Sequence, residues 1–240
     1  MSKSRILKII LTISTVTWVA LVLVLIYMFL WKTPTSKEVF EASQNFVVEL
    51  KSNTGETLVT YGSAVIIDGN RTLVTNAHMV TYKQSGLYIS YEYFEIRFSY
   101  EDEYREVNLI KYDLNLDIAF LQMNDITDIK LKPSTISDSS KIHSGDIVYA
   151  VGNGLNHGIG ITKGIVSLPQ VNINYNDLER NVIQCDLIIN DGNSGGALLN
   201  EYGELIGITT FRIKDSTGNP VYGIAFSVPI NVAIAYLNTN

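Results

Sequence analysis

The chain has 240 residues, a formal net charge of −6 and a hydrophobic content of 46 %. This length suits one large domain or two small ones, with enough chain to bury a core. The charge is uneven, because residues 1–37 hold five of the 18 basic side chains and none of the 24 acidic ones. The remaining 13 basic and 24 acidic side chains give the rest of the chain a net charge of −11. A domain this acidic repels phosphate backbones, so we expect no nucleic acid as a partner.

The sequence contains one cysteine, Cys185, and three histidines, His78, His143 and His157. One cysteine excludes a disulfide within the chain, and the histidines are too widely spaced for a metal-ligand motif. We therefore expect no metal ion and no cofactor. Cys185 is expected to be a buried small hydrophobic residue rather than a catalytic thiol.

The first predicted element is a segment of 23 residues without a charged side chain, from Ile9 to Trp31. As a helix it would be roughly 34 Å long, which is enough to cross the hydrocarbon core of a membrane. A cleaved signal peptide would have a shorter apolar stretch and a small-residue cleavage site, and neither is present. The sequence therefore predicts an uncleaved transmembrane anchor over residues 9–31.

Three basic residues and the amino terminus precede this segment, whereas two basic residues follow it closely. Because positive charge is retained on the cytoplasmic side, residues 1–8 are predicted to be cytoplasmic and residues 32–240 to lie outside the cell membrane. The stretch TSKE directly after the anchor fits a capping box. Residues 32–44 are therefore interpreted as a linker with a short helix.

From about residue 45 onward, short runs rich in Val, Ile, Tyr and Phe are separated by Gly, Asn, Asp and Ser. Runs such as SAVIID, EIRFSY and DIVYAVG have the length and composition of β-strands. No long amphipathic helix interrupts them, so the predicted fold class is all-β, as a barrel or a sandwich. Residues 124–145 are the most linker-like interior segment. PINVAIAYLN is the one late helix candidate, with Pro229 in its first turn.

A serine flanked by glycines, Ser194 in INDGNSGGALLN, is the first candidate catalytic residue. An alcohol is a poor nucleophile at neutral pH unless an imidazole takes its proton and a carboxylate orients that imidazole. His78 lies at the end of the strand-like run LVTNAHMV, and Asp117 begins the run DIAFLQM. Asp113 is the alternative acid, but the apolar run after Asp117 places Asp117 at the start of a strand.

The segments TNAHMV, LDIAFLQ and GNSGGALLN resemble the three active-site segments of trypsin-like serine proteases, in particular those of the HtrA type. The strings SGDIVYAVGN, GIVS, GELIGI and GIAFSVPIN follow in family order, so the resemblance covers most of residues 45–235. It implies two six-stranded β-barrels of the trypsin-like (chymotrypsin) fold, at about 45–125 and 140–230, in a protease domain over residues 45–240. It also implies a bacterial origin.

The same resemblance implies a role for each residue of the site. Ser194 would be the nucleophile, His78 the general base and then acid, and Asp117 the orienting carboxylate. The backbone N–H groups of Gly192 and Ser194 would form an oxyanion hole, with Asn193 shaping the turn. A Cβ at Gly192 would hinder the backbone shape that such a hole requires.

In this fold the base of the substrate pocket lies about six residues before the nucleophile, which indicates Ile188 or Ile189. Ile213 would line the same pocket. An apolar, shallow pocket favours a small or aliphatic P1 residue, the substrate residue whose carbonyl is attacked. Arg212 lies next to Ile213, where relatives of this type usually have an apolar residue.

Together these observations predict a membrane-anchored serine endopeptidase that hydrolyses exposed or unfolded polypeptides outside the cytoplasm through an acyl-enzyme. A catalytically idle protease-like scaffold or holdase for a membrane partner is the alternative that the sequence leaves open. Most relatives of the HtrA type carry PDZ domains after the protease domain, whereas this sequence ends at Asn240, so we expect none. Relatives are often trimers, which leaves a homo-oligomer open.

Overall fold

The computed structural model describes residues 2–30, 32–55, 57–98, 103–124, 132–175 and 178–239. The chain divides into two units, Met1–Pro34 and Thr35–Asn240. The first unit contains one helix, α1 (Lys3–Leu30), which by length and composition can cross a membrane over Lys3–Tyr27. This helix includes most of the predicted anchor, whose last residue lies outside the described residues.

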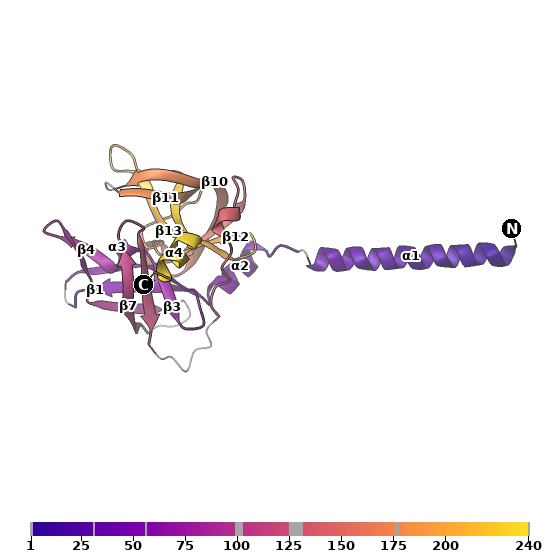
Figure 1. The fold of residues 1–240 in the computed structure, drawn as a ribbon, viewed down its shortest axis with the longest axis horizontal. Helices are drawn as coiled ribbons and strands as arrows, with labels where there is room; N and C mark the ends of the chain where they lie inside the picture. Colours follow the sequence, from indigo (N-terminus) through magenta and orange to yellow (C-terminus); the bar gives the residue numbers. More distant parts are fainter. Residues whose placement is uncertain are drawn as a thin grey trace. The chain divides into compact units, whose positions relative to one another are not determined.

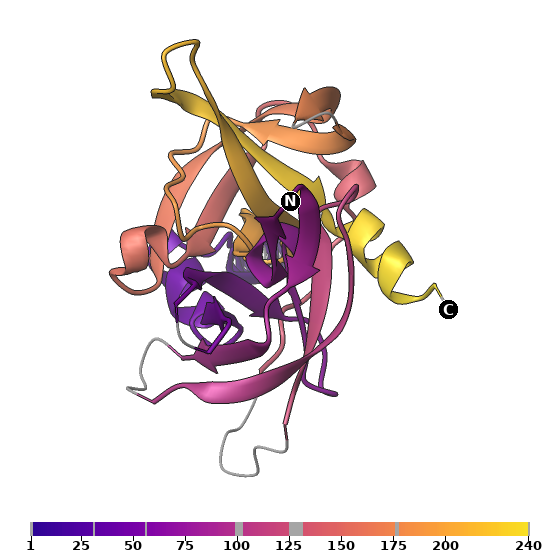
Figure 2. The ribbon, with the colours of Figure 1, turned by 90° about the vertical axis from the view of Figure 1, so that its left-hand side faces the viewer.

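The second unit contains two closed β-barrels of six strands each (Figures 1 and 2), which confirms the predicted fold class. The order around the first barrel is β1-β2-β3-β8-β7-β6, and around the second it is β10-β11-β14-β13-β12-β9. Antiparallel pairing of β1 with β6 closes the first ring, and pairing of β9 with β10 closes the second. Because closure leaves no free sheet edge, every strand of each barrel is paired on both sides.

The first barrel is built from β1 (Val47–Asn53), β2 (Val59–Ile66), β3 (Thr72–Thr75), β6 (Tyr93–Arg97), β7 (Arg105–Asp113) and β8 (Ile118–Met123). The second is built from β9 (Ile147–Gly152), β10 (Gly160–Tyr175), β11 (Leu178–Cys185), β12 (Ala197–Asn200), β13 (Leu205–Lys214) and β14 (Pro220–Pro229). The other elements are α2 (Ser36–Ser43), α3 (Ala77–Val80), the hairpin β4 (Thr81–Gln84) and β5 (Leu87–Ser90), η1 (Ser139–Lys141), η2 (Gly154–Asn156) and α4 (Ile230–Leu237).

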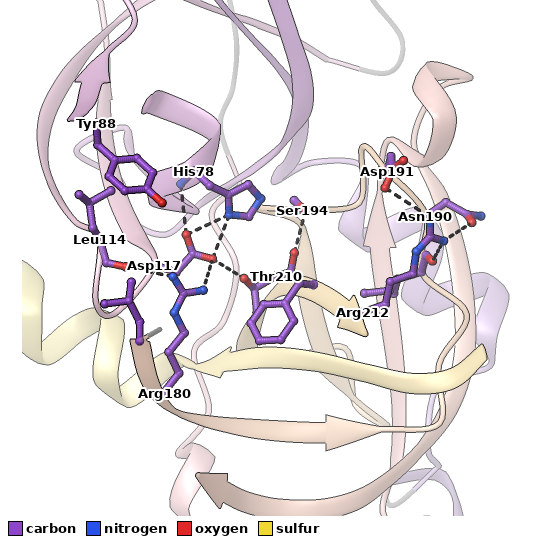
Figure 3. Close-up of a pocket in the computed structure, with 13 residues that line it drawn as sticks. His78, Tyr88, Leu114, Asp117, Arg180, Asn190, Asp191, Ser194, Thr210 and Arg212 are labelled. Atoms are coloured by element: carbon purple, nitrogen blue, oxygen red, sulfur yellow. Dashed lines mark hydrogen bonds and ion pairs between the residues drawn. The ribbon is translucent and has the colours of Figure 1, made fainter. Parts of the chain in front are cut away.

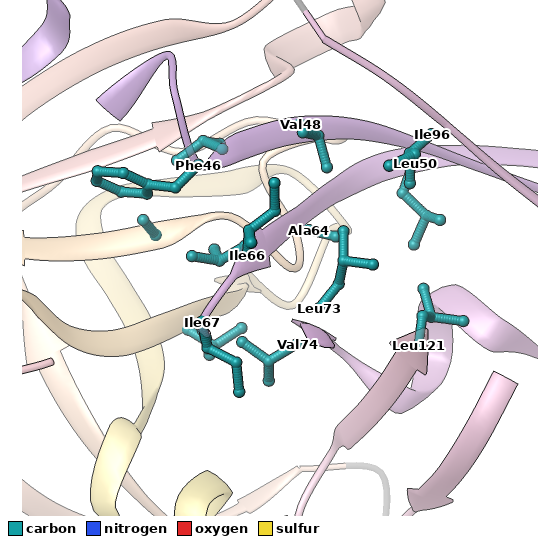
Figure 4. Close-up of a cluster of buried hydrophobic side chains, with 14 of the residues drawn as sticks. Phe46, Val48, Leu50, Ala64, Ile66, Ile67, Leu73, Val74, Ile96 and Leu121 are labelled. Atoms are coloured by element: carbon teal, nitrogen blue, oxygen red, sulfur yellow. The ribbon is translucent and has the colours of Figure 1, made fainter. Parts of the chain in front are cut away.

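The cores of the two barrels meet at β9. On this strand Val148 and Ala150 face the interior of the second barrel, whereas Tyr149 and Val151 belong to the core that continues into the first. This alternation follows from the two-residue period of a strand, and it explains why the run IVYAV is apolar at every position. The first-barrel part of that core is shown in Figure 4. At β9 the two barrels are therefore joined by packed apolar side chains.

Two short helices flank the barrels. Thr35 caps α2 with its side chain while Glu38 reaches back to the Thr35 backbone, so the predicted capping box is confirmed. The late helix α4 is also confirmed, but Pro229 is its N-cap rather than a residue of its first turn. The reason is that β14 extends through Pro229 and keeps its backbone extended, with ψ at 137°.

Cys185 lies inside the second barrel with almost no exposed surface, as expected. Burial, together with the nearby charge of Asp186, raises the pKa of Cys185 to about 12. A thiol that holds its proton this tightly is a packing residue, because only the thiolate is a good nucleophile.

Candidate active site

His78 lies on the short helix α3, directly after β3 ends in the first barrel. The residue before that helix, Asn76, is fully buried and holds three distant segments together. Its Nδ2 donates to the carbonyl oxygen of Asp117 at 3.0 Å, and its Oδ1 accepts from the backbone N–H of Gly195 at 2.7 Å. One amide therefore sets the positions of the histidine, aspartate and serine segments relative to one another.

Asp117 is the buried acid of the site, with 1 % of its side chain exposed. It has a φ of +56° just before β8, and its carboxylate faces His78. The ring Nδ1 of His78 lies 2.9 Å from each carboxylate oxygen, and the backbone N–H of His78 donates to Oδ1 at 3.1 Å. Three contacts to one neighbour fix the direction of the imidazole.

Two further residues hold the Asp117 carboxylate. The hydroxyl of Thr210 on β13 donates to Oδ2, and Nη1 of Arg180 on β11 lies 3.3 Å from the same oxygen. Burial by itself would raise the pKa of Asp117, but His78, Arg180 and Thr210 together outweigh it and hold the pKa below its usual value. The carboxylate is therefore ionised at neutral pH, and because it cannot donate, Nδ1 of His78 carries the proton.

Ser194 lies in a loop that the first barrel supports. The hydroxyl of Ser63 on β2 donates to the carbonyl oxygen of Gly192 at 2.8 Å and accepts from the N–H of Asn153 at 2.8 Å. The backbone N–H of Ser63 donates to the carbonyl oxygen of Ser194 at 2.9 Å. Gly192 has a φ of +95°, and a Cβ there would collide with the carbonyl oxygen of Asn153, so only glycine fits.

Two carbonyl groups of the turn before Ser194 are occupied by backbone hydrogen bonds. The carbonyl of Asp191 accepts from the N–H of Leu155 at 2.7 Å, and that of Asn190 accepts from the N–H of Asn193 at 3.0 Å. Within the described ranges, the N–H groups of Gly192 and Ser194 make no hydrogen bond to the protein. Two unpaired donors on either side of Asn193 can bind an anionic oxygen if both point to one place.

His78, Asp117 and Ser194 line one cavity of about 300 Å³ (Figure 3). The side chain of Ser194 donates to the carbonyl oxygen of Thr210 at 2.8 Å. Arg180 and Arg212 also line the cavity, on either side of the serine. In the part of the chain that the structure describes, no group of three or more His, Cys, Asp or Glu side chains is placed to hold a metal ion.

The predicted pocket residues occupy three different places. Ile189 is buried and lines the cavity. Ile188 is exposed and is not among the lining residues, whereas Ile213 packs against the cluster that contains Phe211 and Phe226. The alternative acid Asp113 caps its own turn instead, accepting from the N–H groups of two following residues at 2.8 and 3.0 Å.

Sequence reasoning did not identify Asn76, Thr210 or Arg180 as site residues. Asn76 directly precedes the helix that carries His78, and a polar residue within the otherwise mostly apolar run LVTNAHMV could have marked it as a site residue. Thr210 and Arg180 lie within strands whose pairing decides which way a side chain points, so nothing local in the sequence marks them.

Comparison with known proteins shows which family the chain belongs to. Residues 62–208 match the family described as trypsin-like peptidase domain. The chain is 41 % identical over 174 residues to the periplasmic pH-dependent serine endoprotease DegQ of Escherichia coli (strain K12), covering 72 % of this chain and 35 % of DegQ. It is 34 % identical over 177 residues to the serine endoprotease DegS of Escherichia coli (strain K12), covering 72 % of this chain and 46 % of DegS.

Among solved structures, that of the HtrA-type protease AlgW with a tripeptide is similar, with a TM-score of 0.71 and 28 % identity. The similarity covers 85 % of this chain and 62 % of that chain. The chain thus spans between about a third and a half of the length of DegQ and DegS. The family match and the two barrels agree, and this chain belongs to the trypsin-like peptidase domain family.

Proposed function

We propose that the protein is a membrane-anchored serine endopeptidase that hydrolyses exposed or unfolded polypeptides outside the cytoplasm, with Ser194, His78 and Asp117 as its catalytic residues. The observation that carries the proposal is the fixed imidazole. His78 is held by Asp117 through Nδ1 and lines the same cavity as Ser194. A site built only for packing has no need of an ionised, buried acid aimed at a partly exposed histidine.

The first step begins with a rotation of Ser194. Its hydroxyl leaves the carbonyl oxygen of Thr210 and turns toward Nε2 of His78, which has a free lone pair because Nδ1 carries the ring proton. Nε2 takes the hydroxyl proton while Oγ bonds to the substrate carbonyl carbon. Asp117 then stabilises the imidazolium that forms.

The tetrahedral oxyanion is bound by the N–H groups of Gly192 and Ser194, with Asn193 holding the turn between them. When the carbon–nitrogen bond breaks, the imidazolium gives its proton to the leaving amine and an acyl-enzyme remains. Water, deprotonated by His78, then attacks the acyl carbon, the bond from that carbon to Ser194 Oγ breaks, and His78 returns the proton to Oγ as the acid product leaves. Two such donors contribute about 3 kcal/mol or more to lowering the barrier.

Two observations support the proposed location. The apolar helix α1 at the amino terminus is long enough to cross a membrane, with its basic end on the cytoplasmic side, and DegQ is by name a periplasmic enzyme. We therefore place the unit Thr35–Asn240 outside the membrane, where exposed polypeptide segments are the substrates. Protease added to intact spheroplasts should degrade this unit. Full protection in intact spheroplasts, with degradation only after lysis, would contradict the orientation.

Labelling with a fluorophosphonate tests the chemistry directly, because this reagent bonds only to an activated serine. The wild type should be labelled and should degrade unfolded casein, whereas Ser194→Ala should do neither. His78→Ala should lower the labelling rate by about 10³-fold or more, because the base is lost. A folded wild type that resists labelling would favour the scaffold function instead.

A further inference from the structure

Arg212 lies in the cavity beside Ser194 and contacts the loop on the opposite wall. Its Nη1 donates to the carbonyl oxygen of Ile189 at 2.7 Å and to Oδ1 of Asn190 at 2.9 Å. Its Nη2 lies 3.3 Å from Oδ1 of Asp191. Figure 3 shows the guanidinium on the side of Ser194 away from Asp117, next to Asn190 and Asp191. A positive charge therefore stands between β13 and the loop that precedes the serine.

The position of the Arg212 guanidinium indicates which substrate residue it would contact, namely P1. The Ser194 hydroxyl contacts the carbonyl of Thr210, and Arg212 lies two residues further along the same strand. Both Thr210 and Arg212 line the cavity. A peptide whose carbonyl carbon reaches Ser194 thus presents its own side chain, P1, to the guanidinium.

The charge of Arg212 is poorly compensated within the protein. Its side chain is 15 % exposed, whereas that of its acidic partner Asp191 is 91 % exposed. The other two contacts are a carbonyl and an amide oxygen, which carry no net charge. The second acid lining the cavity, Asp117, is already paired with His78 and Arg180. A partly desolvated cation without a buried counter-ion is a binding site for an anion.

We infer that Arg212 makes this pocket select substrates with a carboxylate, Asp or Glu, at P1, an inference that rests on the proposed function. A P1 carboxylate can displace the exposed Asp191 side chain and pair with the planar guanidinium through two hydrogen bonds. An aliphatic P1 side chain would shield the cation from water and give it no partner. The pocket thus prefers an acidic residue to the small or aliphatic one that the sequence predicts.

The test compares peptides that differ only at P1, using the full chain in detergent micelles. Glu and Gln have the same shape, so the ratio of their kcat/KM values isolates the charge. We expect the wild type to cleave the Glu peptide at least about tenfold faster than the Gln peptide. Arg212→Met should bring this ratio close to one. The same variant should cleave a matched peptide with Leu at P1 faster than the wild type does, because the pocket becomes apolar. Arg212→Lys should keep a reduced preference for Glu.

Two variants provide controls. Asp191→Asn removes the competing carboxylate and should raise cleavage of the Glu peptide by about two- to fivefold. Lys141→Gln removes one positive charge from an exposed side chain of η1, and it should leave the Glu/Gln ratio unchanged. If the Glu/Gln ratio fell as much in Lys141→Gln as in Arg212→Met, the preference would come from the total charge of the protein, and the inference would be overturned.

Binding to Ser194→Ala separates this inference from the proposed function. Calorimetry with the matched Glu and Gln peptides should show tighter binding of the Glu peptide, with the difference abolished by adding Arg212→Met. A wild type that is labelled by fluorophosphonate but cleaves and binds both peptides equally overturns the role of Arg212 alone. A wild type that is neither labelled nor active overturns the endopeptidase function, and the inference with it.

Discussion

Two arginines lie on opposite sides of Ser194 (Figure 3), and each lies 3.3 Å from an aspartate oxygen. Arg180 pairs with Asp117, and the two side chains are 9 % and 1 % exposed. Arg212 pairs with Asp191, which is 91 % exposed. The same distance thus describes two different interactions, because a water-excluded pair is a fixed part of the fold and a solvated acid is readily replaced.

The largest expected difference between the Asp117–Arg180 pair and the Asp191–Arg212 pair is in the rate of peptide hydrolysis. Asp117→Asn removes the carboxylate that orients His78, so kcat/KM should fall by about 10⁴-fold. Asp191→Asn should change kcat/KM for a peptide with a neutral P1 residue by less than about threefold. Steady-state kinetics on protein of matched circular dichroism measures both. Retention of a tenth of the activity in Asp117→Asn would remove Asp117 from the proposed mechanism.

Stability should distinguish the two arginines by a smaller amount. Arg180→Met leaves the Asp117 carboxylate buried with one cation fewer and also removes the hydrogen bond to the carbonyl of Leu114, at 3.1 Å. The free energy of unfolding of residues 35–240 should fall by about 3 kcal/mol. Arg212→Met should cost about 1 kcal/mol or less, because its acidic partner is solvated. Urea titrations compare the two, and equal losses would contradict the distinction.

The pH dependence of these losses gives the smallest and most specific effect. Because the pKa of folded Asp117 is depressed, its contribution to stability is complete above the unfolded value of about 3.9 and disappears as the pH falls through the folded value. The difference in unfolding free energy between wild type and Arg180→Met should therefore be constant from pH 7 to about 5 and shrink toward pH 3. A difference that stayed constant down to pH 3 would show that Arg180 acts through packing and not through its charge.

The strands and the three segments that meet at the cavity could be predicted because their signals are local. Short apolar runs between turn residues indicated the β-strands, and the strings around His78, Asp117 and Ser194 carry the family pattern within a few residues each. The confirmed capping box at Thr35 is equally local, since its two hydrogen bonds join residues three apart.

Ile189 was predicted to line the cavity at Ser194, but the arginines and Thr210 in its lining could not be predicted, because their place depends on how strands pair. The register of β13 against β14 shifts between Thr209 and Phe211 and again between Arg212 and Lys214. Such shifts interrupt the alternation of faces along a strand, and here Thr210, Phe211 and Arg212 all line the cavity while Ile213 packs against a hydrophobic cluster. Pairing of this kind joins residues far apart in the chain, so neither Arg180 nor Thr210 could be assigned to Asp117 from the sequence.

Ser194 rests with its hydroxyl on a main-chain oxygen of β13 instead of on a side chain. A peptide oxygen does not titrate, so this dormant contact is insensitive to acidity for as long as the strand is paired. Leaving it takes only a turn about the Cα–Cβ bond, which side chains complete in picoseconds to nanoseconds, while the surrounding loop stays in place. In the proposed mechanism, therefore, one side-chain torsion takes Ser194 from this resting contact to His78.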